Sequence, residues 1–166
     1  QPMAAPAGVE ASTPQGRTAD LRVAPAAGSL DAAIKTLSNA KRPMIIVGYG
    51  ALEGMPEVIQ LAETLSAPIA TTFKAKGQIA DTHLLAAGVL GRSGTPIASW
   101  FMNEADVLLV FGASFSDHTG IYPTKATIQV DNDPMRLGKR HPVDMPILGD
   151  VTVTAQQLAA ALDETS

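Results

Sequence analysis

Short apolar runs separated by amphipathic segments constrain the fold of this chain more than any other feature. The clearest runs are residues 44–47, 106–111 and 127–130. Runs of this length without polar alternation are typical of strands buried on both faces, as in parallel sheets. Between them lie stretches with helical periodicity, such as residues 55–65. Alternation of the two patterns predicts repeated strand–helix–strand units and hence a parallel sheet.

Three weaker runs complete the predicted sheet. Residues 67–72, 86–90 and 146–148 are each expected to form a strand. The sequence therefore predicts an open, doubly wound, six-stranded parallel sheet with helices on both faces.

Capping residues place the predicted helices. Ser29 is expected to cap the first helix, and Thr95 with Pro96 to begin another that ends near Glu104. Asp150 or Thr152 is expected to cap the last helix, which runs through Leu162.

Composition excludes several classes of protein. A length of 166 residues and 46% hydrophobic residues fit one globular domain, and a net charge of −4 argues against nucleic-acid binding. The absence of cysteine removes disulfides and thiolate catalysis. No apolar run approaches the ~20 residues that span a bilayer, and a cytoplasmic location is expected.

Catalytic and metal-binding residues are not evident. His83, His118 and His141 lack ligand spacing and are interpreted as surface residues. No nucleophile, base and orienting group assemble from the sequence, so no catalytic or metal residue is predicted.

The segments that follow the strands are the candidate ligand site, because parallel sheets bind ligands at their carboxyl edge. Gly48 and Gly50 could admit a diphosphate, although a tight turn without ligand fits equally well. Thr72, Lys74 and Lys76 suit phosphate oxygens.

Acidic residues follow the last two predicted strands. Asp131 could accept a hydrogen bond from a ribose. Asp133 and Asp150 are more simply interpreted as helix caps, with Asp133 capping a short turn of helix.

Residues 1–28 are rich in Ala, Pro, Gly and Thr and are interpreted as a linker, with the domain proper at 29–166. This pattern indicates either a domain excised from a longer protein or a processed whole one.

Several motifs in this order resemble the central domain of thiamine diphosphate-dependent enzymes, most closely the pyruvate oxidase or quinone-linked pyruvate dehydrogenase type. The motifs are residues 42–50, 67–72, 75–77, 105–112, 128–134, 137–141 and 149–150. The resemblance implies a Rossmann-like, DHS-like NAD/FAD-binding fold.

The resemblance also implies a role and a set of site residues. The domain would bind the ADP part of FAD, or ADP, and scaffold flanking catalytic domains. Thiamine diphosphate and Mg²⁺ would be held by those flanking pyrimidine- and diphosphate-binding domains, in a homo-oligomeric parent enzyme that could lie peripherally at the membrane if quinone-linked. The implied cofactor-binding residues are Gly48, Gly50, Thr72, Lys74, Lys76, Val89, Leu90, Gly91, Gly112, Ser114, Phe115, Asp131, Asn132, Asp150 and Val151.

Two alternatives remain open at this point. The chain could be a non-binding structural middle domain of a thiamine diphosphate-dependent decarboxylase or synthase. It could also be a stand-alone nucleotide-binding domain.

Overall fold

The sheet has the predicted number of strands, all of them parallel. A computed structural model describes residues 20, 22–116, 119–120 and 124–164. The strand order is β3-β2-β1-β4-β5-β6, and every neighbouring pair is parallel. The strands are β1 (Pro43–Val47), β2 (Ile69–Thr71), β3 (Ala86–Val89), β4 (Val107–Phe111), β5 (Ala126–Asp131) and β6 (Met145–Leu148).

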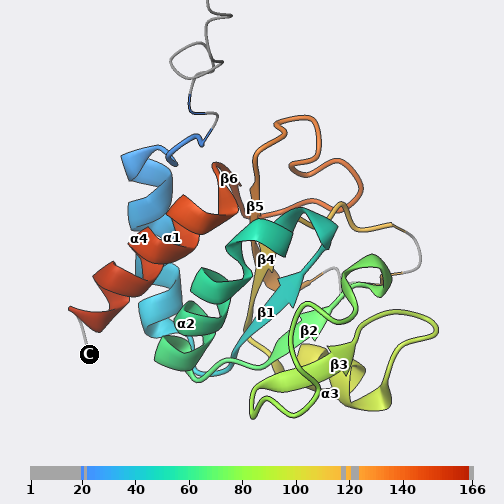
Figure 1. Cartoon of the computed structure of the whole chain (residues 1–166). Helices are drawn as coiled ribbons and strands as arrows, with labels where there is room; N and C mark the ends of the chain where they lie inside the picture. The colour runs from blue at the N-terminus through green and yellow to red at the C-terminus, as the bar shows by residue number, and fades with distance from the viewer. Residues whose placement is uncertain (1–19, 21, 117–118, 121–123, 165–166) are drawn as a thin grey trace, which may run out of the picture.

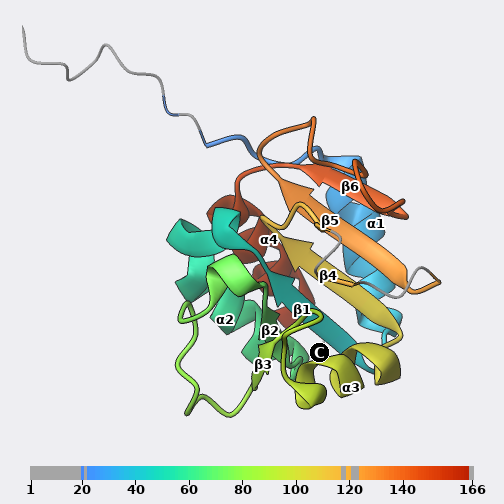
Figure 2. The ribbon, with the colours of Figure 1, turned by 90° about the vertical axis from the view of Figure 1, so that its right-hand side faces the viewer.

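Helices cover both faces of this sheet, as predicted (Figures 1 and 2). One face packs against α1 (Ala27–Asn39), α2 (Met55–Leu65) and α4 (Val151–Asp163). The other face packs against α3 (Pro96–Glu104) and the loops that follow β4 and β5. Two short 3₁₀ helices, η1 (Tyr49–Gly54) and η2 (Phe73–Ala75), follow β1 and β2.

Two of the predicted helix starts are confirmed by their hydrogen bonds. The Thr95 hydroxyl accepts from the Ala98 N–H at 3.4 Å, and the Asp150 carboxylate accepts from the Val153 N–H at 3.0 Å. Each bond satisfies a backbone donor that the first helical turn leaves unpaired.

Two other capping predictions are wrong. Helix α1 begins at Ala27, so Ser29 lies inside its first turn, where the Ser29 and Leu30 N–H groups donate to the Ala26 carbonyl. The segment after Asp133 is a turn rather than a helix. The Asp133 carboxylate closes that turn locally by accepting from the Met135 N–H at 2.9 Å, which competes with helix formation.

The order of the strands reverses between β1 and β4, and the turns after these two strands touch through their backbones. The Gly48 N–H donates to the Phe111 carbonyl at 2.8 Å, and the Gly50 N–H donates to the Gly112 carbonyl at 3.1 Å. A Cβ on Gly48 would lie 2.2 Å from the Gly112 oxygen. Glycine at position 48 is therefore required by backbone contact.

At the opposite edge of the sheet, one carboxylate fixes the start of β1 against that of β4. Asp106 accepts hydrogen bonds from the Lys41 and Arg42 N–H groups at 2.8 and 3.0 Å. Desolvation raises the pKa of Asp106, but these backbone donors and the Arg42 charge outweigh it and leave the pKa below its usual value of 3.8.

We predict that Gly48→Ala destabilises the chain by about 1–3 kcal/mol, the usual cost of forcing an atom into a packed site. Urea unfolding followed by circular dichroism measures the change. Gly28→Ala is the matched control, because a Cβ there meets nothing within 4 Å and alanine is favoured over glycine within helix α1. Equal stability of wild type and Gly48→Ala would contradict the close contact.

We predict that Asp106→Asn lowers stability at neutral pH and that its deficit shrinks in acid. The folded pKa lies below the unfolded one, so the stabilisation is complete above about pH 4 and is lost as pH falls through the folded pKa. Unfolding free energies of both proteins from pH 2.5 to 7 test this. A deficit that is independent of pH would contradict it.

Candidate functional site at the carboxyl edge of the sheet

All the residues predicted to contact a cofactor lie at one edge of the molecule. The six strands run in the same direction, so their carboxyl ends meet along that edge (Figure 2). Going from β3 to β6, the predicted residues are Val89, Leu90 and Gly91; Thr72, Lys74 and Lys76; Gly48 and Gly50; Gly112, Ser114 and Phe115; Asp131 and Asn132; Asp150 and Val151. The sheet thus brings together six segments that are far apart in the sequence.

The middle of the edge is built from glycine, but its donors are already used. The N–H groups of Gly48 and Gly50 both bond to the backbone around β4. These two N–H groups are therefore not free to donate to a diphosphate. Gly48 and Gly112 are buried where the order of the strands reverses, which is where sheets of this topology form a crevice.

The β5–β6 end of the edge is acidic. Asp131 is buried, with 2% of its surface exposed, and its Oδ1 accepts from the Asp133 N–H at 3.0 Å. Its Oδ2 is also buried and has no hydrogen-bond partner among the described residues. A buried carboxylate oxygen without a donor is costly, so Asp131 is a strong candidate to accept a hydrogen bond from a ligand.

Asp150 lies beside it with a structural task of its own. Its carboxylate caps α4, as the capping interpretation predicts, and its N–H donates to the Val23 carbonyl at 2.7 Å. The neighbouring Val151 is buried in the first turn of α4, whereas Asn132 is exposed. Helix capping leaves Asp150 as a secondary member of the site.

The β2–β3 end of the edge is cationic. Lys74 and Lys76 are exposed in the turn formed by η2, and the half-buried Thr72 begins that turn. Beside them, Val89 ends β3 and Leu90 is buried. Among the predicted site residues, the lysines therefore lie at one end of the edge and the carboxylates at the other.

The loop after β4 packs back onto the sheet, and it corrects one prediction. Ser114 is exposed, whereas Phe115 is buried in a left-handed conformation with φ of 49°. The Phe115 ring contacts the His141 ring edge-to-face, with centroids 5.8 Å apart. His141, predicted to be a surface residue, is partly buried because Phe115 covers it, and its Nε2 is buried.

Of the other two histidines, only His83 lies among the described residues. His83 is partly buried, and its Nδ1 accepts from the Leu85 N–H at 3.2 Å. Its Nε2 lies 3.4 Å from Glu63, so the prediction of a simple surface residue is also wrong here. His118 lies outside the described residues. Within the described part of the chain, no group of three His, Asp or Glu could hold a metal ion.

Gln129 was not among the predicted site residues, yet it joins the two loops beside the acidic end. Its side chain is fully buried in β5. Its amide donates to the carbonyls of Ala113 and Arg136 at 3.0 and 3.2 Å, and its oxygen accepts from the Gly138 N–H at 2.8 Å. The available signal is a long polar side chain between two apolar residues of a strand predicted to be buried.

The segment before α1 was also missed, because its composition indicated a linker. Besides the bond between Val23 and Asp150, Pro25 packs against Gly149, where an added Cβ would lie 3.4 Å from its ring. Residues 22–25 therefore lie against the acidic end of the edge.

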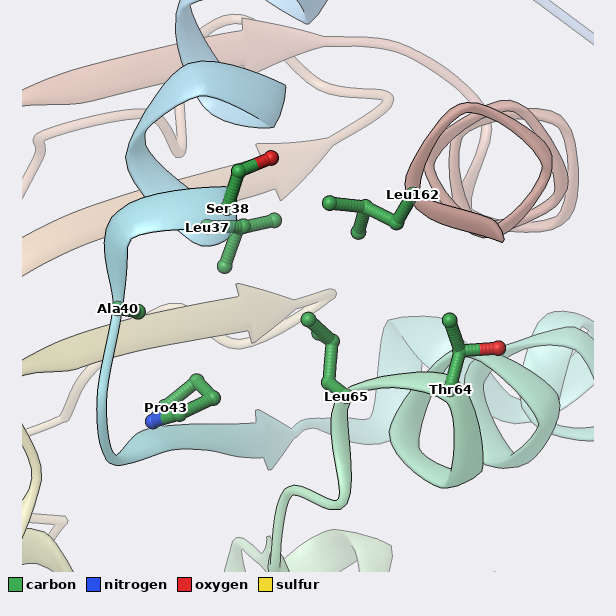
Figure 3. A pocket seen from close by; sticks show the side chains of 7 residues that line it. All are labelled: Leu37, Ser38, Ala40, Pro43, Thr64, Leu65 and Leu162. Atoms are coloured by element: carbon green, nitrogen blue, oxygen red, sulfur yellow. The ribbon is translucent and has the colours of Figure 1, made fainter. Parts of the chain in front are cut away.

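One hollow in the described surface lies away from this edge. It has a volume of about 190 Å³ and sits near the start of β1, between the carboxyl ends of α1, α2 and α4 (Figure 3). Its lining has no charged side chain and comprises Leu37, Ser38, Ala40, Pro43, Thr64, Leu65 and Leu162. The hollow is therefore remote from the polar groups at the carboxyl edge.

Comparison with known proteins assigns this architecture. The protein family described as "thiamine pyrophosphate enzyme, central domain" matches residues 30–158 of this chain. The chain belongs to this central-domain family. A solved structure described as a thiamin diphosphate-dependent enzyme from Mycobacterium smegmatis superposes with a TM-score of 0.72 and 26% identity, over 87% of this chain and 29% of that one. The predicted family and fold are confirmed.

Relatives of this central domain carry different names. A protein named as an acetolactate synthase large subunit from Methanococcus aeolicus is 40% identical over 79% of this chain and 23% of its own length. The pyruvate oxidase of Lactiplantibacillus plantarum is 35% identical over 78% of this chain and 22% of its own. The comparisons therefore do not single out the oxidase branch. The chain spans about a quarter of the length of these relatives.

Thiamine diphosphate is thus the cofactor named for the family, and the central domain is one part of a multidomain enzyme in it. In the described part of the chain, no helix is both long and apolar enough to cross a membrane.

We predict that Gln129→Leu destabilises the central domain by about 3 kcal/mol, because it removes three hydrogen bonds from a buried position. Gln60→Leu on the exposed face of α2 is the control and should stay within about 0.5 kcal/mol of wild type. Urea unfolding measures both variants. A Gln129→Leu protein as stable as the control would show that the two loops do not depend on this side chain.

Proposed function

We propose that this domain binds the ADP part of FAD, or ADP itself, along the carboxyl edge of its sheet, and that it scaffolds the catalytic domains of a thiamine diphosphate-dependent 2-oxo acid enzyme. The adenosine would lie over the acidic β5–β6 end. The diphosphate would lie toward the middle and the cationic β2–β3 end.

One observation carries the adenosine assignment. The buried carboxylate of Asp131 has one oxygen engaged by the Asp133 N–H and the other without a donor among the described residues. A ribose hydroxyl is a neutral donor of the kind that such an oxygen accepts, and acids at strand ends hold riboses in related sheets. Binding would remove the cost of an unpaired buried acceptor.

The rest of the edge fits the remaining parts of the ligand. Glycine at 48, 50 and 112 lets the turns after β1 and β4 meet at the switch point, where sheets of this topology form the crevice that would take an extended diphosphate. Lys74 and Lys76 supply positive charge on the next strand. The exposed Asn132 offers an amide beside the adenosine position.

The parent enzyme would depend on the flanking domains for its chemistry. Those domains would bind thiamine diphosphate and Mg²⁺, and the parent would assemble as a homo-oligomer. Relatives named acetolactate synthase and pyruvate oxidase support either carboligation or oxidation of a 2-oxo acid. A bound flavin would supply electron transfer, and this domain would contribute binding and orientation rather than a catalytic residue.

A second candidate is a structural middle domain that binds nothing. It is favoured by the glycine turn, because the Gly48 and Gly50 N–H groups already donate to backbone carbonyls of the domain. The unpaired Asp131 oxygen favours the binding role.

We predict that Asp131→Asn weakens ADP and FAD binding about tenfold, because an amide nitrogen at the Oδ2 position cannot accept the ribose hydrogen bond. Titration calorimetry with each nucleotide measures Kd, and the shift in melting temperature reports binding to the folded state. The Asn oxygen can still accept from the Asp133 N–H, so the loop stays closed.

Asp133→Asn is the matched control, because it makes the same change two residues away on a partly exposed side chain that closes its own turn. It should bind both nucleotides like wild type. If the wild-type chain binds neither nucleotide, the structural role is favoured. If Asp131→Asn and wild type have equal Kd, the adenosine does not bind at Asp131.

A further inference from the structure

The hollow between the carboxyl ends of α1, α2 and α4 is large enough to hold a short aliphatic chain. Its volume is about 190 Å³, and the side chains of Leu65 and Leu162 point into it (Figure 3). For comparison, an apolar cavity of about 150 Å³ can hold a benzene molecule. The lining also includes Ser38 and Thr64, each near the end of its helix. The hollow thus combines apolar walls with polar groups at two helix ends.

The carbonyl of Ser38 has no backbone donor at the end of α1. Carbonyls in the last turn of a helix lie beyond the reach of the helix's own N–H groups. The next N–H groups that could serve this carbonyl are those of Lys41 and Arg42. Both donate to the Asp106 carboxylate instead, at 2.8 and 3.0 Å. The bonds that hold the start of β1 therefore leave the Ser38 carbonyl without a backbone donor among the described residues.

The carbonyl of Thr64 is in the same situation at the end of α2. The Ala67 N–H donates to the Ala62 carbonyl at 2.9 Å. The next residue, Pro68, has no N–H to donate. Within the described residues, no backbone N–H therefore donates to the Thr64 carbonyl. Two of the three helices around the hollow end with an acceptor that a ligand can use.

Basic side chains do not neutralise these three helix ends. The carboxyl end of a helix carries partial negative charge, which lysine or arginine in the last turn offsets in many proteins. The last turns of α1, α2 and α4 contain neither residue. Exposed carboxylates add negative charge, namely Glu63 on α2 and Asp163 and Glu164 at the end of α4. Lys41 and Arg42 follow α1 but do not line the hollow. The hollow therefore favours a cation.

We propose that this hollow receives a lysine side chain of a neighbouring domain of the parent enzyme. The aliphatic stem of the lysine packs on the leucines, and its ammonium donates to the carbonyls at the helix ends. Lysine fits better than arginine, because the guanidinium fork matches carboxylates and phosphates and the lining holds neither.

A neighbouring domain is the source of lysine that the comparisons favour. The matched family is one domain of a multidomain enzyme, and the chain spans about a quarter of the length of its relatives. The hollow lies near the start of β1, away from the carboxyl edge, so a docked lysine and a nucleotide can be bound at the same time. The inference rests on the scaffolding part of the proposed function and not on nucleotide binding.

The test is titration of the chain with n-butylammonium, whose four-carbon stem and ammonium reproduce a lysine side chain. Amide chemical shifts in NMR at constant ionic strength follow the binding. We expect saturable shifts at residues 37–40, 64–66 and 162, with a Kd in the millimolar range for so small a ligand. Sodium butyrate, which has a stem of similar length and the opposite charge, should bind about tenfold more weakly.

Two variants supply the cation from the chain itself. Ser38→Lys and Thr64→Lys each place an ammonium at a helix end, and each should raise the butylammonium Kd about tenfold. Lysine is favourable at a helix end, so both variants should melt at or above the wild-type temperature. Gln157→Lys is the matched control, because it adds the same charge on the exposed face of α4 and outside the lining. It should change Kd by less than about twofold.

Three results overturn the lysine site: no saturable butylammonium binding, equal binding of butyrate, or equal Kd for the two lysine variants and the control. Hollow shifts that change when the ligand-free chain is diluted would show that a second copy supplies the lysine, and would overturn the assignment to a neighbouring domain. ADP binding is measured separately. A chain that binds ADP but not butylammonium keeps the nucleotide function and loses this inference, whereas the reverse result overturns nucleotide binding alone.

Discussion

The backbone contact between the turns after β1 and β4 is the constraint on which the rest of the structure depends. These strands are the central pair of the sheet, and the order of the strands reverses between them. The turns meet through Gly48, Gly50 and Gly112, with backbone atoms where side chains would otherwise stand. This close approach fixes the position of one half of the sheet relative to the other. The contact lies at the switch point, where the crevice of such a sheet is expected.

The charged residues of the candidate site follow different strands on either side of this contact. Lys74 and Lys76 follow β2, whereas Asp131 and Asp150 follow β5 and β6. Opposite charges held apart by two or more strands do not neutralise one another strongly, because their attraction through solvent is screened over about 10 Å. The arrangement instead suits an elongated ligand that carries hydroxyl donors at one end and anionic oxygens farther along.

Much of the fold could be predicted because each local signal agreed with the global pattern. Buried parallel strands are short and continuously apolar, and Thr95 and Asp150 cap their helices through their own side chains. The prediction that Ser29 caps α1 failed because the Ala26 carbonyl closes the first turn of this helix without a polar side chain. The bridge made by Gln129 could not be inferred, since its partners lie up to 16 residues away in loops without regular periodicity.

In the candidate site too, features set by the local sequence could be predicted, whereas features set by tertiary structure could not. That Asp131 ends a strand can be inferred from the sequence, but that one oxygen is engaged and the other lacks a donor depends on the folded loop. The burial of this carboxylate is what distinguishes it from Asp133, which is partly exposed and closes a turn. Two acids two residues apart thus differ in role because only one of them is desolvated. A ligand hydroxyl stabilises the complex most where the protein acceptor has already lost its water.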